Sequence, residues 1–128
     1  MNEECGALGK LIEVQQVGKR FGAVQALEGI SFSVPGGGSL ALRGPSGSGK
    51  TTLLRLICGL EEPDRGQVAL DGQVVSQPGR LAPPWQRGIG AVFQKPALWP
   101  HLTVRQNAAF GLTGWGKQQA AARLDELL

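Results

Sequence analysis

Eight consecutive residues have the types and spacing needed to hold phosphate groups. They run from Gly44 to Thr51 and fit the pattern G-x-x-x-x-G-K-[ST]. Its glycines let the backbone curl tightly, so that successive N–H groups converge on phosphate oxygens. In such a loop the Lys50 ammonium neutralises the β- and γ-phosphates, and the Thr51 hydroxyl ligates Mg²⁺. The motif therefore predicts a site for the phosphates of a nucleotide together with Mg²⁺.

The flanking residues favour this interpretation over a plain glycine linker. Residues 39–43 read as a short strand that leads into the loop. After the loop, apolar residues at Leu53, Leu56, Ile57 and Leu60 follow the i, i+3, i+4, i+7 spacing of one helical face. A helix beginning at Lys50 would aim its positive end and its free N–H groups at the phosphates.

Length and composition fit one soluble globular domain. The chain has 128 residues and a net charge of +3, with scattered basic residues that give no argument for nucleic acid. Apolar runs stay short of the roughly 18 residues of a membrane span. The opening residues 1–4 are acidic, unlike a secretory signal. Cys5 and Cys58 are too few for a disulfide framework or a metal site, so we expect a reducing cytoplasm.

The residues before the loop predict a tail and several strands. Residues 1–10 show no periodicity and are expected to be disordered. We expect strands at 11–17, 23–27 and 30–34, with a turn at 18–20 between the first two. In the last of these, Ile30, Phe32 and Val34 alternate onto one face. A turn at 35–38 then leads to the strand of the phosphate loop.

The residues after the loop predict a hairpin, one more strand and two helices. Residues 67–75 read as a hairpin with an Asp71-Gly72 turn, followed by a loop at 76–84 and a strand at 89–93. Thr103 and Gln106 form a capping box for a helix at 104–110, which 111–116 interrupts. A final helix is expected over 117–128, and its apolar stripe is Ala121, Leu124 and Leu128.

Five stretches together resemble the ATP-binding subunit of an ABC transporter. These stretches are Phe21, Gly44–Thr51, Gly59–Gly66, Arg87–Gln94 and Leu98–Val104. The last resembles importers for ferric iron, sulfate, polyamines, thiamine or sugars. The resemblance covers residues 11–128. It implies an α/β fold with a P-loop NTPase core and an antiparallel amino-terminal β subdomain, in a protein that couples ATP binding and hydrolysis to solute import.

The resemblance also implies roles for individual residues. Phe21 would stack on adenine; the alternative is a core aromatic. Gln94 would help to coordinate Mg²⁺ or the attacking water; the alternative is a polar strand end. Lys50 and Gln94 are thus the catalytic candidates, and Thr51 and Gln94 the metal candidates. The residues expected to hold ATP are Phe21, Gly44, Ser46, Gly47, Ser48, Gly49, Lys50, Thr51 and Thr52.

Two kinds of partner are implied. Residues 98–102 would face a transmembrane permease subunit, with Trp99 and Leu102 as anchors; alternatively they pack onto the small helical region. A second ATP-binding subunit would complete a dimer. The chain would then lie on the cytoplasmic face of the membrane, held there by the permease. His101 is not at the position of the family's functional histidine and receives no catalytic role, and Arg65 and Arg87 are expected to be solvated charges.

The sequence also departs from the family pattern. It contains no Leu-Ser-Gly-Gly-Gln signature and no apolar run that ends in Asp-Glu. Asp125 and Glu126 lie in a helix-period stretch and are interpreted as a surface pair. We therefore expect the amino-terminal half of the domain, with a carboxy-terminal half absent. Such a chain would bind ATP without efficient turnover, and an apolar sheet edge without a partner would make it marginally stable.

Two alternative functions remain open. The chain could be a nucleotide-binding remnant of a truncated gene without enzymatic activity. It could also be another P-loop protein, such as a small-molecule kinase or a GTPase. A GTPase should contain Asn-Lys-x-Asp, which is absent, and the segment after Gln94 supplies no arginine-rich lid of the kind that a kinase needs. The sequence does not indicate which solute would be transported.

Overall fold

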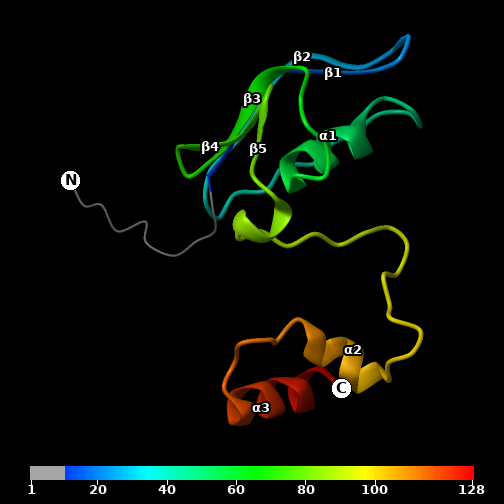
Figure 1. Cartoon of the computed structure of the whole chain (residues 1–128), viewed down its shortest axis with the longest axis vertical. Coiled ribbons are helices and arrows are strands. Elements are labelled where there is room, and N and C mark those ends of the chain that lie inside the picture. The colour runs from blue at the N-terminus through cyan, green and yellow to red at the C-terminus, as the bar shows by residue number, and fades with distance from the viewer. Residues whose placement is uncertain (1–10) are drawn as a thin grey trace, which may run out of the picture. The chain divides into compact units, whose positions relative to one another are not determined.

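An antiparallel sheet forms the first part of the computed structural model, which describes residues 11–128 (Figure 1). The expected tail at 1–10 lies outside these residues. The sheet has the strand order β2-β1-β3-β4-β5, and all neighbouring strands run antiparallel. Its strands are β1 (Ile12–Phe21), β2 (Val24–Val34), β3 (Arg65–Leu70), β4 (Gln73–Gln77) and β5 (Arg80–Leu81). The sheet belongs to a first unit that ends at Ala91, and Val92–Leu128 form a second unit.

The first hairpin is longer than the sequence predicted. β1 continues through residues 18–20, so the turn expected there is wrong; the chain turns at Gly22-Ala23, where Gly22 takes a φ of 59°. β2 is one strand with irregular register opposite β1, not two. The predicted alternation is confirmed, because the apolar positions 30, 32 and 34 are half-buried while Ser31 and Ser33 are exposed.

The second hairpin confirms the Asp71-Gly72 turn. Both residues have positive φ, 51° and 76°, as the tight turns of hairpins require. The Asp71 carboxylate also accepts a hydrogen bond of 2.8 Å from the backbone N–H of Leu11. The loop predicted at 76–84 is partly wrong, because β4 reaches Gln77 and β5 adds a short hairpin before a 3-10 turn at Pro84–Gln86.

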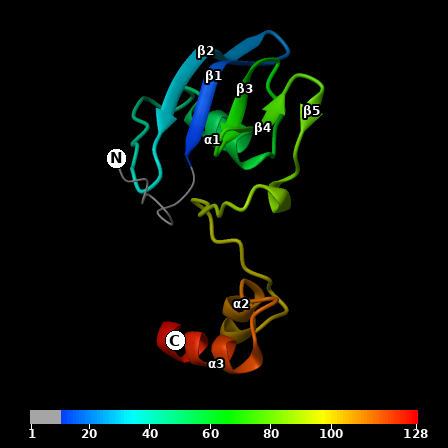
Figure 2. The same ribbon diagram turned by 90° about the vertical axis from the view of Figure 1, so that its left-hand side faces the viewer.

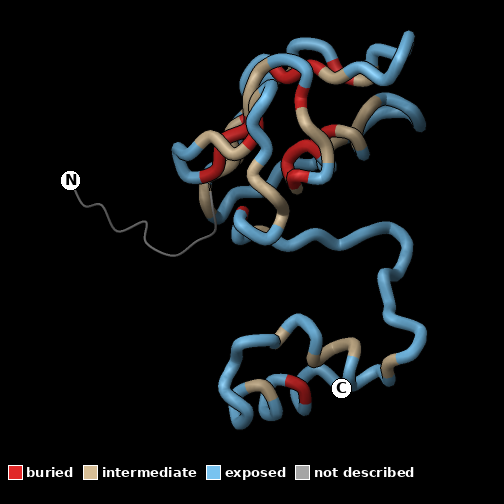
Figure 3. The backbone as a smooth tube through the Cα atoms, viewed as in Figure 1, coloured by how far each residue is buried: buried red, intermediate tan, exposed pale blue. Residues whose placement is uncertain are grey.

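Helix α1 (Lys50–Cys58) covers one face of this sheet (Figure 2). It begins at Lys50 as predicted, and buried residues gather where it meets the strands (Figure 3). Leu53, Leu56 and Ile57 are buried as expected, whereas Leu60 is 44% exposed because the helix ends at Cys58 and Gly59 turns left-handed. The core that α1 completes consists of Val14, Val17, Leu27, Leu53, Leu56, Ile57 and Val68.

Two predicted strands do not form. Residues 39–43 and 89–93 have no regular secondary structure, and none of the described strands pairs with them. A strand needs a neighbour to accept and donate its backbone hydrogen bonds. The apolar pattern of these segments was therefore not sufficient, and both predictions are wrong for the structure described.

The second unit contains α2 (Val104–Phe110) and α3 (Lys117–Leu127). The predicted capping box is confirmed: the Gln106 N–H donates to the Thr103 hydroxyl at 3.2 Å, and the Thr103 N–H donates to the Gln106 side chain at 2.9 Å. Leu124 is buried, but the predicted stripe is wrong at positions 121 and 128, which are exposed. No described helix is both long enough and apolar enough to span a bilayer.

Candidate functional site

The phosphate-loop motif lies in the first unit, between β2 and α1, and most of it is exposed. Gly47 and Gly49 take φ values of 80° and 93°, which side chains disfavour. At Gly49 a Cβ would lie 2.6 Å from the Ala26 carbonyl oxygen and 2.7 Å from a Leu27 methyl carbon. The loop therefore presses its backbone directly against β2, and only glycine fits at this contact.

The amino-terminal end of α1 is left free for an anion. Among the described residues, no side chain caps this end, and the first turn contains no acidic residue. α2 differs, since Thr103 and Gln106 cap it with their own side chains. The first N–H groups of a helix have no partner within the helix and carry its positive dipole end. The sequence thus forms a helix end that a phosphate can complete.

Lys50 places its charge in the middle of the loop. Its ammonium donates to the carbonyl oxygens of Gly44 and Pro45, each at 2.7 Å, and to the Ser48 hydroxyl at 3.0 Å. A Cβ on Gly44 would lie only 2.8 Å from that hydroxyl, so the loop closes tightly around the lysine. The motif residues predicted from the sequence are therefore brought together, with a cation at their centre.

The donor set of the first turn suits a small hard cation only in part. Thr51 is exposed and Thr52 is half-buried, directly after Lys50. A hydroxyl oxygen is a suitable ligand for Mg²⁺, which also keeps waters and phosphate oxygens. Within residues 11–128, no group of three or more His, Cys, Asp or Glu side chains could hold a metal by itself. Mg²⁺ at Thr51 would therefore need the phosphates of a nucleotide as further ligands.

Phe21 lies at the end of β1 and is not a core aromatic. Its side chain is 45% exposed, and the Lys19 ammonium lies 5.3 Å from the centre of its ring. Lys19 precedes it by two residues, so both side chains project from the same face of the strand. An exposed ring can stack on a planar base. The adenine role itself stays a prediction.

Asp64 holds the chain just before Phe21. Its carboxylate accepts from the Arg20 N–H at 2.7 Å and from the Lys19 ammonium at 3.4 Å, and its own N–H donates to the Gly18 carbonyl at 2.9 Å. The hydrogen bond from Arg20 is the main cause that lowers the pKa of Asp64; slight burial opposes it, and the Lys19 charge adds to it.

Arg87 is buried, so the prediction of a solvated charge is wrong for it. Only 1% of the residue is exposed. Its guanidinium donates to the carbonyls of Leu56 and Ile57 at the end of α1, at 3.2 and 2.9 Å. On the other side it donates to the Ser76 hydroxyl at 2.6 Å, and to the carbonyls of Val75 and Ala82.

These bonds join the carboxyl end of α1 to the hairpin of β4 and β5. Burial lowers the pKa of the Arg87 guanidinium, against a smaller opposing influence of Cys58, yet arginine keeps its charge in proteins. Gly59 is required beside it, because a Cβ there would collide with the guanidinium. Arg65, by contrast, is exposed as expected.

Gln94 lies in the second unit, in an exposed segment without regular structure. The sequence predicted that a strand at 89–93 would lead directly into Gln94, and that strand does not form. Its catalytic and metal roles stay predictions. His101 contacts the edge of Trp99, with 6.0 Å between the ring centres.

The predicted permease segment is partly packed within its own unit. Trp99 is 48% exposed and contacts Phe110 at 5.6 Å between ring centres. Asn107, which the sequence did not single out, accepts from the Trp99 N–H and donates to the Leu102 carbonyl. Leu98 is more exposed, at 68%. The segment therefore packs on α2, as the alternative interpretation expected, and it still presents apolar surface. Its contact with a permease subunit stays a prediction.

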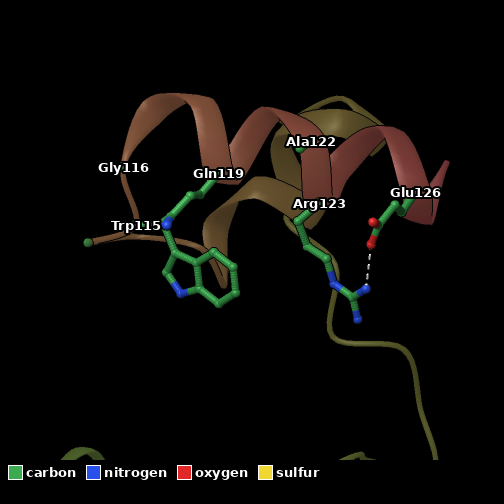
Figure 4. A pocket seen from close by; sticks show the side chains of 7 residues that line it. Trp115, Gly116, Gln119, Ala122, Arg123 and Glu126 are labelled. Carbon is green, nitrogen blue, oxygen red and sulfur yellow. Dashed lines mark hydrogen bonds and ion pairs between the residues drawn. The ribbon is translucent and has the colours of Figure 1, made fainter.

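A recess beside α3 contains none of the predicted nucleotide residues (Figure 4). Trp115, Gln119 and Arg123 line it, together with Glu126, which accepts from Arg123 at 2.7 Å. Asp125 pairs with Arg105 at 2.8 Å. The interpretation of Asp125 and Glu126 as a helix surface pair is confirmed.

The sequence reasoning missed Lys19, Asp64 and Arg87. Lys19 shares the face of Phe21 only because β1 continues through residues 18–20, where the sequence predicted a turn. Asp64 and Arg87 act on segments distant in sequence, and the sequence carries no local signal of those contacts.

Comparisons with known proteins identify the family. A family model described as ABC transporter matches residues 27–128. The chain is 50% identical over 120 residues to the spermidine/putrescine import ATP-binding protein PotA of Chromobacterium violaceum, covering 92% of this chain and 32% of that protein. It is 51% identical over 117 residues to the Fe(3+) ions import ATP-binding protein FbpC of Pseudomonas fluorescens, covering 91% of this chain and 33% of that protein.

Solved structures agree with the fold. A bacterial ABC exporter with ATP bound matches with a TM-score of 0.74 at 29% identity, covering 90% of this chain and 20% of that one. The ADP conformation of an ATP-binding cassette of an ABC transporter matches with a TM-score of 0.68 at 29% identity, covering 89% of this chain and 45% of that one. The chain spans about a third of the length of the curated relatives named above. The predicted α/β ABC-type ATPase fold is confirmed, and the chain belongs to the ABC transporter family.

Proposed function

We propose that this chain binds Mg-ATP through Gly44–Thr51 as the phosphate-holding part of an ATP-binding subunit of an importer. One observation carries the proposal: the uncapped end of α1 and the Lys50 ammonium meet in one tight loop. Positive charge and free N–H groups are what a triphosphate needs. The curated relatives, which include a sulfate/thiosulfate import ATP-binding protein of Synechococcus elongatus, favour import.

The proposed contacts combine the loop geometry with the roles that the family resemblance implies. The backbone of residues 44–52 and the Lys50 ammonium hold the phosphates, the Thr51 hydroxyl contributes to Mg²⁺, and the exposed Phe21 ring stacks on adenine. Gln94 is proposed as the second polar ligand of Mg²⁺ or the residue that orients water, because an amide both donates and accepts. The relatives differ in their named solutes, so no solute is proposed.

Hydrolysis and import are proposed for a subunit that acts with partners. Residues 98–102 keep exposed apolar surface at Leu98 and Trp99, which suits a permease subunit as docking partner. A second ATP-binding subunit and a position on the cytoplasmic face of the membrane follow from the same proposal. The alternative of a small-molecule kinase or GTPase gives way to the family match, whereas a nucleotide-binding chain without turnover stays an open prediction.

The test compares nucleotides that differ in phosphate number. Calorimetric titration in the presence of Mg²⁺ should show binding of ATP and ADP and none of AMP, since the loop recognises the phosphates beyond the first. In Thr51→Ala, added Mg²⁺ should strengthen ATP binding less than in the wild type. Ser33→Ala removes a hydroxyl from the exposed face of β2 and serves as the matched control. Equal binding of AMP and ATP would contradict the proposal.

A further inference from the structure

Lys19 lies against the ring of Phe21 and is itself well covered. Its ammonium is 5.3 Å from the ring centre, and only 13% of its side chain is exposed, although the ring is 45% exposed. A long lysine side chain normally extends into solvent. Here it occupies a defined position beside an aromatic ring that remains accessible.

Asp64 fixes this position from a distant part of the chain. It binds the Lys19 ammonium, the Arg20 N–H and the Gly18 carbonyl, so three consecutive residues before Phe21 are tied to the start of β3. Gln25, on the opposite strand, donates to the Lys19 carbonyl at 3.5 Å and to the Leu27 carbonyl of its own strand at 2.6 Å. The end of the first hairpin is thus held on both strands, although its tip projects beyond the rest of the sheet (Figure 1).

The same hairpin carries the contact with the phosphate loop. Phe21 pairs with Val24 at the hairpin end, and Gly49 presses on the Ala26 carbonyl two residues further along β2. Residues 24–26 of β2 therefore connect the residue paired with Phe21 to the contact with the phosphate loop, across a register shift at Ala26. Contacts that hold the end of this hairpin thus also bear on where the ring lies relative to the loop.

We propose that Lys19 and Asp64 are positioning residues for the nucleobase, and this inference rests on the function proposed above. Lys19 covers part of the Phe21 ring and limits its rotation, which leaves the exposed surface for adenine. Asp64 keeps the lysine in place. A cation beside an aromatic ring is attracted by the ring's quadrupole, so ring and lysine stabilise one another before the base arrives.

The test separates base recognition from phosphate recognition. Dissociation constants for Mg-ATP and for magnesium tripolyphosphate are measured by calorimetry for the wild type, Lys19→Gln, Phe21→Ala and the double variant. Lys19→Gln should weaken ATP binding about two- to fivefold, and Phe21→Ala about tenfold. Neither should change tripolyphosphate binding. In the Phe21→Ala background, Lys19→Gln should have no further effect, because Lys19 acts through the ring.

Further variants separate positioning from charge and from stability. Lys19→Arg keeps a cation beside the ring and should retain wild-type affinity, whereas Asp64→Asn should weaken ATP binding alone. Lys117→Gln, which removes one positive charge at the start of α3, is the matched control. Equal weakening of ATP and tripolyphosphate by Lys19→Gln, or additive effects in the double variant, would overturn the inference while leaving the proposed function intact. Failure of the wild type to bind either ligand would overturn both.

Discussion

Asp64 shows how one exposed carboxylate can connect two parts of the first unit. Its pKa lies below the ordinary value of about 3.9, chiefly because it accepts from the Arg20 N–H. A lowered pKa in the folded state means that the charged form stabilises folding. This contribution is fully present above the unfolded pKa and is lost as the pH falls through the folded pKa.

We therefore expect Asp64→Asn to lower the free energy of unfolding at pH 7 and to matter less in acid. Urea unfolding of both proteins at pH 7, 5, 4 and 3 measures this difference. The difference between the two proteins should begin to shrink as the pH falls below the unfolded-state pKa of about 3.9 and should vanish only below the lower folded-state pKa of Asp64. A difference that stays constant from pH 7 to 3 would show that the Asp64 charge does not stabilise the fold.

At the scale of elements, the junction between β2 and α1 depends on Gly49. An alanine there must adopt a left-handed φ, which costs about 1 kcal/mol, and must also displace the Ala26 carbonyl or the Leu27 side chain. We expect Gly49→Ala to lower the free energy of unfolding by about 2 to 4 kcal/mol and to weaken Mg-ATP binding.

Gly47→Ala is the matched control for that variant. Gly47 has a similar positive φ of 80°, but a Cβ there would meet no atom within 4 Å. It should cost only the conformational term of about 1 kcal/mol. Equal unfolding free energies for the two variants, measured by urea denaturation, would contradict the close approach of the loop to β2.

The opposite end of α1 depends on Arg87. Arg87→Met keeps much of the side-chain volume but leaves the carbonyls of Ile57 and Ala82 without their donor. Buried acceptors without partners cost about 1 to 3 kcal/mol each, so we expect a loss of at least about 3 kcal/mol in unfolding free energy. Arg65→Met, at an exposed arginine on β3, should change it by about 0.5 kcal/mol or less. Similar effects of both changes would show that the Arg87 hydrogen bonds are not important for stability.

Signals from residues close together in the sequence predicted helices and turns better than they predicted contacts between distant residues. The capping box at Thr103 and Gln106, the Asp71-Gly72 turn and the start of α1 at Lys50 all depend on neighbours in sequence, and all three are confirmed. The Gly44–Thr51 motif also lies within eight consecutive residues, and its phosphate-binding role stays a prediction. The burial of Arg87 was not predicted, because its acceptors lie in helix and hairpin segments 5 to 31 residues away.

At the scale of the molecule, the connection between the units is where sequence and structure differ most. The sequence predicts a strand at 89–93, and the structure has an irregular segment in which Val92 is fully exposed and Phe93 is 56% exposed. A strand forms only if other strands supply hydrogen bonds to it, and none of those described does. The apolar pattern of residues 89–93 does not reveal that partner strands are missing.

Limited proteolysis measures the state of this segment. Exposed backbone without paired hydrogen bonds opens at low free-energy cost, so chymotrypsin should cut first after Phe93. Trypsin is a useful control, because Pro96 follows Lys95 and blocks its cleavage there. Mass spectrometry of the early products identifies the bond. First cuts elsewhere, with the bond after Phe93 protected, would contradict the irregular segment and favour a paired strand.

The most direct measurement of the central claim is Mg-ATP binding to this chain and to Lys50→Ala. In the proposed site Lys50 would donate charge-assisted hydrogen bonds to phosphate, and their loss should weaken binding about 10- to 100-fold in calorimetric titration. Lys117→Ala removes the lysine that opens α3 and should bind as the wild type does. A wild-type chain that binds Mg-ATP, with loss in Lys50→Ala alone, is the predicted result. Equal affinities of the wild type and Lys50→Ala would contradict the claim that Gly44–Thr51 holds the nucleotide.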